Sequence, residues 1–442
     1  MQRSNYGSDT NINNLKQLSV AKDWELIENT LHRNDFWAFL SKDVNMEDGR
    51  ISIIFQYIYD NDANFYKKNQ TGDYLFRYYY QLFAHGKKAG EQVSTSAFVD
   101  ALWNQVMDCF RMLQNWFYNP KVYNLVGLLV KHGLSIKQIA DIYNGDGVNT
   151  NEDFIYALNN RVRVVIVDSI PIAKEQSDLG IGKDEEYINL FFNVSADKAK
   201  MPDLLRFINI REINKTIDNA LKDIDKEDDE KKKSDLKRSA RDVMSHIYRF
   251  PFEALDVFGW DIEHIDSATT NGLTNPEEQK KWIACAKEAI GVLLDSDDNF
   301  KALQDAYNDP HTTDKKSVLN KIVKRIQDLV GEAESDPQKN WIGNLTLLDS
   351  GTNRSYKNKI FAWKSDILRQ RIQSGVFVPV CTQNVFNKNF TGCSSDKWKW
   401  SLEDKKAYHS YILNEIKSFK LEYGESPVID CKITEINESA ER

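Results

Sequence analysis

Two segments that lie far apart in the chain restrict its fold more than any other feature. The first holds the adjacent residues Glu263 and His264, and the second holds Asn344 and Asn353, nine residues apart (353 − 344 = 9). A carboxylate beside a histidine, combined with two asparagines, has a joint chemical meaning only if the four side chains meet. Because 80 residues separate His264 from Asn344 (344 − 264 = 80), the intervening chain must form an excursion whose ends return to one place.

These four side chains are the groups that a one-metal phosphodiesterase needs. Hydrolysis of a phosphodiester requires a deprotonated water and positive charge close to the developing negative charge. A histidine of ordinary pKa is neutral at pH 7, so His264 is the candidate general base. Glu263 and the amide oxygen of Asn353 are oxygen ligands suited to Mg²⁺ (or Mn²⁺), with waters and substrate phosphate completing the shell. We expect Asn344 to fix the loop and the orientation of His264.

The pattern around these residues predicts two strands and a helix. Glu263 and His264 would point to opposite faces of a strand, and the polar residues that follow predict that the strand ends or bends there. Leu345–Leu348 is an apolar strand candidate, residues 349–352 have turn chemistry, and Asn353 begins a helix. Strand, turn and helix in this order form the second half of a ββα metal finger of the HNH (His-Me finger) type.

The rest of the chain is predicted to be mainly helical, because apolar residues recur at spacings of three and four. Helices are expected in the stretches 24–40, 51–59, 74–82, 98–118, 122–130, 202–221, 276–294, 299–307, 316–330 and 402–421. Arg161–Val167 and Tyr187–Val194 are the strand candidates of the first half. Residues 223–233 place acids four residues before bases, which favours a solvated helix or helical linker. The predicted fold class is mainly α with a small β component.

Charge and cysteine content limit the partners and the cellular compartment. The net charge of −8 argues against coating of nucleic acid by bulk electrostatics, but a local basic run begins at Asn353. Its candidate DNA contacts are Arg354, Lys357, Lys359 and Lys364. The five cysteines form no CxxC pair, which favours reduced thiols over disulfides or a zinc knuckle. Without a signal-peptide core or an apolar run of transmembrane length, we expect a cytoplasmic protein with no membrane partner.

The motif residues carry a resemblance to a known family. With WDIEHIDS at 260–267, WIGNLTLL at 341–348, and Asn353, Asn358, Phe361 and Lys364, the chain resembles the GmrSD-type restriction endonuclease family, specifically its C-terminal HNH nuclease domain. The resemblance covers roughly residues 250 to 420 and includes the closing segments Val376–Phe386 and Trp400–Tyr408. Residues 24–58 are similar to the helical connector that precedes that domain.

The resemblance implies a DNA-directed, divalent-metal nuclease of a bacterial restriction or anti-phage system, often one that acts on phage DNA with modified bases. By motif position, His264 is the general base, Glu263 and Asn353 are the metal ligands, Asn344 is the supporting asparagine, and Lys364 is a phosphate or structural contact. Family members usually begin with a ParB-like, nucleotide-handling domain marked by a DGQQR-type motif, which this sequence does not contain. That half is expected either as a missing N-terminal domain or as a separate partner.

Four parts are expected along the chain: a polar lead-in (1–17), a mainly helical connector or recognition domain (18–245), an HNH nuclease domain (246–425) with a helical insertion at about 274–340, and a tail (426–442). The leading hypothesis is a DNA endonuclease or nickase. The alternative is a catalytically weak, helical binding or regulatory subunit that acts only with a nucleotide-sensing partner. An RNA-directed nuclease would use the same site, but no RRM- or KH-like signature favours it.

Overall fold

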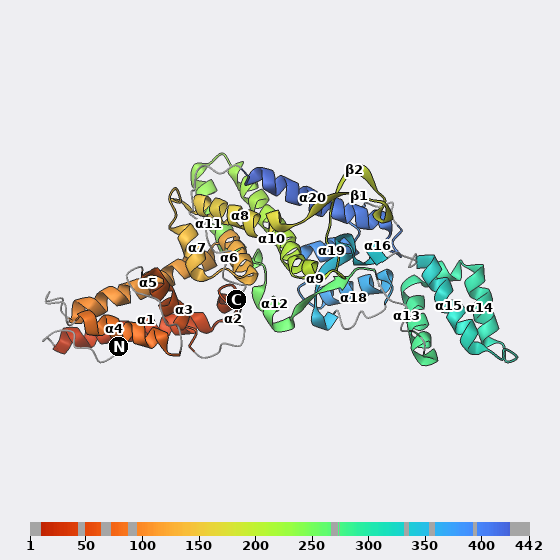
Figure 1. Ribbon diagram of the computed structural model, residues 1–442, viewed down its shortest axis with the longest axis horizontal. Coiled ribbons are helices and arrows are strands. Elements are labelled where there is room, and N and C mark those ends of the chain that lie inside the picture. Colours follow the sequence, from red (N-terminus) through yellow and green to blue (C-terminus); the bar gives the residue numbers. More distant parts are fainter. Residues whose placement is uncertain are drawn as a thin grey trace. The chain divides into compact units, whose positions relative to one another are not determined.

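The computed structural model describes residues 10–42, 49–62, 72–86, 95–266, 273, 275–330, 336–352, 359–391 and 396–424 (Figure 1). These residues are mainly helical, as predicted, with two two-stranded antiparallel sheets. Contacts divide the chain into a first unit (1–159, 216–253 and 426–442) and a second unit (160–215 and 254–425). The sequence pattern did not separate residues 160–215 from the first half. No helix in the described ranges is long and apolar enough to cross a membrane.

The first unit is built from helices. Its elements are α1 (Thr10–His32), α2 (Asn34–Ala38), α3 (Ser52–Asn61), α4 (Tyr74–Gly86), α5 (Thr95–Tyr118), α6 (Pro120–His132), α7 (Ile136–Tyr143), the first part of α8 (Asn151–Val165), the last part of α10 (Lys200–Asp225) and α11 (Glu230–Ile247). Local signals define the ends: the Asn119 side chain caps α6 beside Pro120 at its first position, and Ser135 forms a capping box. Tilted and edge-on aromatic rings form part of the core: Phe36, Phe39, Phe117 and Tyr123.

The predicted strand at Arg161–Val167 is wrong, because these residues complete α8 and enter the 3-10 turn η1 (Val167–Ser169). Leu158, Val162 and Ile166, four residues apart, are at most 1% exposed. The buried residues therefore recur with the period of a helix, and not with the period of two that the alternating sequence of this segment suggested. The strands of this region come later, as the hairpin β1 (Ile172–Gln176) and β2 (Ile181–Ile188), joined through the short turn η2 (Ser177–Leu179).

The charged linker is not a continuous helix. α10 ends at Asp225, and α11 begins at Glu230 with the Asp229 side chain accepting from two backbone N–H groups of its first turn. Glu227 lies in the break and pairs with Lys232 at 2.6 Å instead of the residue four positions on. Asp229 is a strong helix-capping residue, so it starts a new helix where charge spacing alone predicted continuation.

The second unit contains the two motif segments. Its further elements are α9 (Ser195–Lys198), the first part of α10, α12 (Phe252–Phe258), β3 (Trp260–His264), α13 (Pro276–Asp295), α14 (Asp298–Asn308), α15 (Lys315–Val330), α16 (Asp336–Asn340), η3 (Ile342–Asn344), β4 (Leu345–Asp349), α18 (Phe361–Gln373), α19 (Val380–Phe386) and α20 (Leu402–Glu422). The predictions for α13, α14, α15 and α20 are confirmed to within one residue at each end.

The helices α13, α14 and α15 form a group with its own core, and they lie side by side in Figure 1. The buried members of this insertion core are Trp282, Ile283, Ala286, Ile290, Leu294, Phe300, Leu319, Ile322, Val323, Ile326, Val330, Ile360 and Ala362. Ile360 is the N-cap of α18 and Ala362 lies in its first turn, so the insertion packs against the start of that helix. The helices α13, α14 and α15 thus form a packed helical excursion between β3 and β4.

Candidate active site around His264

The excursion returns to its starting point, because β3 and β4 form one antiparallel ladder. Trp260 lies opposite Asp349 at one end, and His264 lies opposite Leu345 at the other. Beyond the ladder, the N–H of Ile265 donates to the backbone oxygen of Asn344 at 2.9 Å. The two motif segments, 80 residues apart in sequence, are thus neighbouring strands. The sequence hypothesis required that the chain between them return to its starting point, and it does.

Asn344 fixes the loop that follows β3. Its side chain is fully buried, and its Oδ1 accepts from the N–H of Asp266 at 3.0 Å. Its Nδ2 donates to the backbone oxygen of Asp266 at 3.3 Å and to that of Lys339 at 2.8 Å. A buried amide is stable only with such partners. Asn344 therefore ties the end of β3 to the turn before β4. These three hydrogen bonds join it to backbone groups and not to the His264 ring.

Glu263 points toward α18, where a lysine meets it. The Lys364 Nζ donates to Glu263 Oε1 at 2.6 Å and to the backbone oxygen of His264 at 2.6 Å. Lys364 is 0% exposed and Glu263 is 8% exposed. Burial raises the pKa of Glu263, and the neighbouring ammonium opposes that rise. The pair fastens α18 to the ladder, and loss of one partner would leave an uncompensated buried charge.

His264 has different neighbours. Its Nε2 lies 3.2 Å from Oδ1 of Asn340, the last residue of α16, and its ring and that of Phe192 are nearly perpendicular, with 5.1 Å between centroids. Because an amide oxygen only accepts, this contact assigns the hydrogen to Nε2 and leaves Nδ1 as the basic nitrogen. Burial lowers the pKa of His264, and the charges of Lys364 and Lys405 lower it further, while the Asn340 bond opposes them.

The strand ends at His264, as the sequence predicted, but the two adjacent side chains still diverge. Glu263 is bonded from α18, whereas His264 contacts α16 and the segment after β2. This is the alternation expected within a strand. A carboxylate and an imidazole are thus held at one strand end, each by its own helix.

The remaining predicted site residues are distributed unevenly. Asn353, Arg354 and Lys357 lie outside the described residues. Lys359 is partly buried, with its Nζ over the Trp363 ring at 4.0 Å from the centroid. Lys364 is inside the protein and donates to Glu263. Of the two roles that the resemblance implies for it, a phosphate contact or a structural contact, this burial favours the structural one.

Sequence reasoning missed three residues that surround His264. Asn340 directly precedes the Trp341 motif, so its place in the chain was a usable signal. Phe192 carried no sequence signal that would have placed it near His264. Lys405, in the first turn of α20, is fully buried and lies 4.0 Å from Asp266. It lies three and four residues before the buried Tyr408 and His409, so its spacing places it on the core face of α20, and only the tertiary packing shows that Asp266 meets it there.

Metal ligands are sparse around this ladder. Within the described ranges, no group of three or more His, Cys, Asp or Glu side chains is arranged to hold a metal ion. Mg²⁺ commonly takes one or two protein carboxylates and completes its shell with water and phosphate oxygens. Of the two predicted ligands, Glu263 lies in the described part and Asn353 does not.

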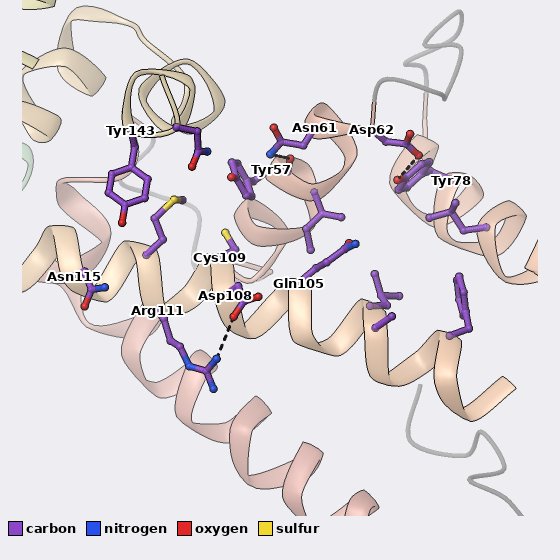
Figure 2. A pocket seen from close by; sticks show the side chains of 17 residues that line it. Tyr57, Asn61, Asp62, Tyr78, Gln105, Asp108, Cys109, Arg111, Asn115 and Tyr143 are labelled. Carbon is purple, nitrogen blue, oxygen red and sulfur yellow. Dashed lines mark hydrogen bonds and ion pairs between the residues drawn. The ribbon is translucent and has the colours of Figure 1, made fainter. Parts of the chain in front are cut away.

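A separate cavity of about 750 Å³ lies in the first unit, lined by residues of α3, α4, α5 and α7 (Figure 2). The Tyr78 hydroxyl donates to Asp62 at 2.9 Å, and Arg111 pairs with Asp108 at 3.1 Å. Both carboxylates of the lining thus have partners, and no histidine is among the lining residues. Because the described lining residues include no histidine, we place the candidate general base at His264.

No protein-family model matches this chain, and no curated protein or solved structure matches it either. The resemblance to the GmrSD-type family therefore stays a prediction from the motif residues. The function of the His264 site has to be argued from its geometry and chemistry.

Proposed function

We propose that this chain is a divalent-metal-dependent DNA endonuclease or nickase that uses His264 as its general base. The observation that carries the proposal is the β3–β4 ladder, which holds Glu263 and His264 beside Asn344 with α18 packed against the same strand end. The succession of β3, β4 and α18 has the order of a ββα metal finger. A bacterial restriction or anti-phage role, with phage DNA as substrate, belongs to the same proposal.

His264 activates the attacking water. With Nε2–H directed at Asn340, Nδ1 accepts the proton of a water held in line with the scissile bond. Burial keeps the pKa of His264 below its ordinary value, so the imidazole is neutral and able to accept a proton at pH 7. Asn340 and the Phe192 ring hold the imidazole in one orientation, which reduces the entropy lost in reaching the reactive geometry.

We place a hard divalent cation at the Glu263 carboxylate. Glu263 supplies a carboxylate at the strand end, and the amide oxygen of Asn353 is the second proposed ligand; both are oxygen donors of the kind Mg²⁺ and Mn²⁺ accept. Such a cation stabilises negative charge on the phosphate when bound. Glu263 Oε1 already accepts from Lys364, so a cation at this carboxylate shares it with, or replaces, the ammonium.

The other residues have supporting tasks. Asn344 holds the backbone after His264 through Asp266, and Lys364 positions Glu263 and the His264 carbonyl from inside α18. Arg354, Lys357 and Lys359 are the proposed phosphate contacts, while the burial of Lys364 favours a positioning role for it.

Cleavage of supercoiled plasmid DNA in Mg²⁺ or Mn²⁺ tests this proposal. His264→Ala should lower the cleavage rate by about 10²–10⁴-fold, the usual contribution of a general base, and Asn353→Ala should weaken metal dependence. His311→Ala removes an exposed histidine of the insertion and should cleave like the wild type. Equal cleavage by wild type and His264→Ala would remove the proposal.

A second candidate function is a regulatory subunit whose metal finger is inactive. The observation that favours it is the Lys364–Glu263 pair, which occupies one carboxylate oxygen with a fully buried ammonium. This candidate requires a nucleotide-handling partner of ParB-like type. It predicts no cleavage by the chain alone and co-purification with that partner through a high-salt wash; full activity of the isolated chain would contradict it.

A further inference from the structure

Two lysines, on the segments that lead into Lys364 and Trp400, lie directly over tryptophan rings. The Nζ of Lys359 is 4.0 Å from the centroid of Trp363, and that of Lys397 is 4.3 Å from the centroid of Trp398. A cation over an indole face is attracted by the ring quadrupole, by about 0.5–1 kcal/mol at exposed positions. The comparable contact of Lys315 with a tyrosine in the insertion is longer, at 5.5 Å.

Both pairs are anchored to the β3–β4 ladder. Trp363 immediately precedes Lys364, whose Nζ bonds Glu263. Trp398 lies two residues before Trp400, whose indole N–H donates to the backbone oxygen of Gly343 at 3.2 Å, next to Asn344. The two segments are also joined to each other, because the Trp400 ring stacks on the ring of Phe361 at 5.7 Å. The lysines therefore occupy two adjoining segments attached to the two motif strands.

The two indoles are held in place by the insertion. Trp363 and Trp398 are partly buried and pack against the insertion core, so each ring is a fixed platform for its lysine. A free lysine side chain loses up to about 2 kcal/mol of conformational entropy when it is ordered. A lysine already held over a ring loses less of that freedom on meeting an anion.

The charge at this surface suits a polyanion. Lys359, Lys397 and Lys399 bring three positive charges. Two carboxylates offset part of this charge: Asp396 lies 3.7 Å from the Lys399 Nζ, and Glu288 of α13 acts on the Cys285 thiol together with Lys359. The chain as a whole carries a net charge of −8, so the charge of these three lysines is opposite in sign to the overall balance. Ammonium groups contact phosphate as point charges and do not read bases.

We propose that Lys359 and Lys397, positioned by Trp363 and Trp398, contact two backbone phosphates of DNA bound at the His264 site. This inference rests on the proposed function, which it extends by naming Lys397 and the two tryptophans. Because the indole faces are covered by their own lysines, the contact is to phosphate and independent of sequence. If the lysines serve only as internal cation–π contacts, their removal will not change the number of ions released on DNA binding.

The test is binding of a fluorescein-labelled duplex oligonucleotide, followed by anisotropy at several KCl concentrations in EDTA, so that no cleavage occurs. Each phosphate contact contributes about 0.9 to the slope of log K against log [salt] for B-DNA. Lys359→Gln and Lys397→Gln should each lower affinity and reduce the slope by about 1. The matched control, Lys315→Gln, also removes one positive charge beside an aromatic ring and should leave the slope near that of the wild type.

A further variant separates positioning from folding. Trp398→Leu keeps an apolar side chain against the insertion core but removes the indole under Lys397, so it should weaken binding while leaving the thermal melting curve close to that of the wild type. Unchanged slopes in both lysine variants, or no duplex binding by the wild type, would overturn the inference. If the lysine variants have reduced slopes but the wild type does not cleave plasmid, the phosphate contacts stand and only the nuclease proposal is refuted. If the wild type cleaves plasmid but the lysine variants have unchanged slopes, the nuclease proposal stands and only the phosphate contacts are refuted.

Discussion

Protonation of His409 should destabilise the part of the fold that supports the candidate site. This histidine lies on α20, is 3% exposed, and accepts a hydrogen bond at Nε2 from the N–H of Ile188 at 2.9 Å. Its ring lies 4.3 Å from that of Trp341, whose indole N–H donates to the backbone oxygen of Ile188. Trp341 leads directly into η3, which carries Asn344. His409 therefore helps to hold the strand β2 against the turn that enters the site.

The pKa of His409 sets the size of the effect. Burial, together with a smaller contribution from the charge of Lys417, lowers it from 6.5 to about 3. The unfolded chain takes up a proton near pH 6.5 while the folded chain does not, so the stabilisation is complete above that pH and is lost as the pH falls toward 3. At 1.36 kcal/mol per pH unit, going from pH 7 to pH 5 should remove about 2 kcal/mol from the free energy of unfolding.

The assay is equilibrium urea unfolding at pH 7, 6 and 5, followed by tryptophan fluorescence, in wild type and His409→Gln. The glutamine carbonyl can accept from Ile188 but does not titrate, so the variant should lose about 2 kcal/mol less than the wild type over this range. Contributions from other groups are common to both proteins and cancel in the difference. His311→Gln, at an exposed position, should follow the wild-type pH dependence. Equal losses in wild type and His409→Gln would refute the reasoning.

Three other substitutions test contacts on which the fold depends, each measured by the change in free energy of unfolding. Lys364→Met leaves Glu263 buried without its ammonium and should cost about 3–5 kcal/mol, with a smaller loss when Glu263→Gln is added; an additive double variant would contradict a direct pair. Asn344→Ala removes three hydrogen bonds, two of them buried, and should cost about 2–4 kcal/mol, and a change below about 0.5 kcal/mol would show that the loop does not depend on it. At Gly127 an added methyl would meet an aromatic side chain at 2.1 Å, so Gly127→Ala should destabilise by about 1–3 kcal/mol. Its control, Gly291→Ala, meets nothing within 4 Å and should leave stability equal or raise it by up to about 1 kcal/mol; the reverse order would be inconsistent with the packing.

Helix positions were predictable where local chemistry and burial agree. α13 begins at Pro276 after Asn275, whose side chain caps it, and α14 begins after the capping Asp297. These signals act between neighbouring residues and so are visible in the sequence. At 161–167 local alternation favoured a strand, but the faces buried by the surrounding helices require the helical period. Burial on a given face is a tertiary property, which is why that prediction was wrong.

The candidate site shows the same division. The sequence alone indicated Glu263, His264 and Asn344 and required that a helical excursion return to them, because side chains 80 residues apart act together only in one place. Only the tertiary structure decided that the two segments pair as adjacent strands, that Asn344 bonds Asp266, and that Lys364 reaches Glu263 across 101 residues. Lys364 and Lys405 lie on the apolar stripes of α18 and α20, three and four residues from buried neighbours, so the spacing indicates that they face the core. The carboxylate that each one meets there belongs to a distant part of the chain, and no spacing within the sequence records that.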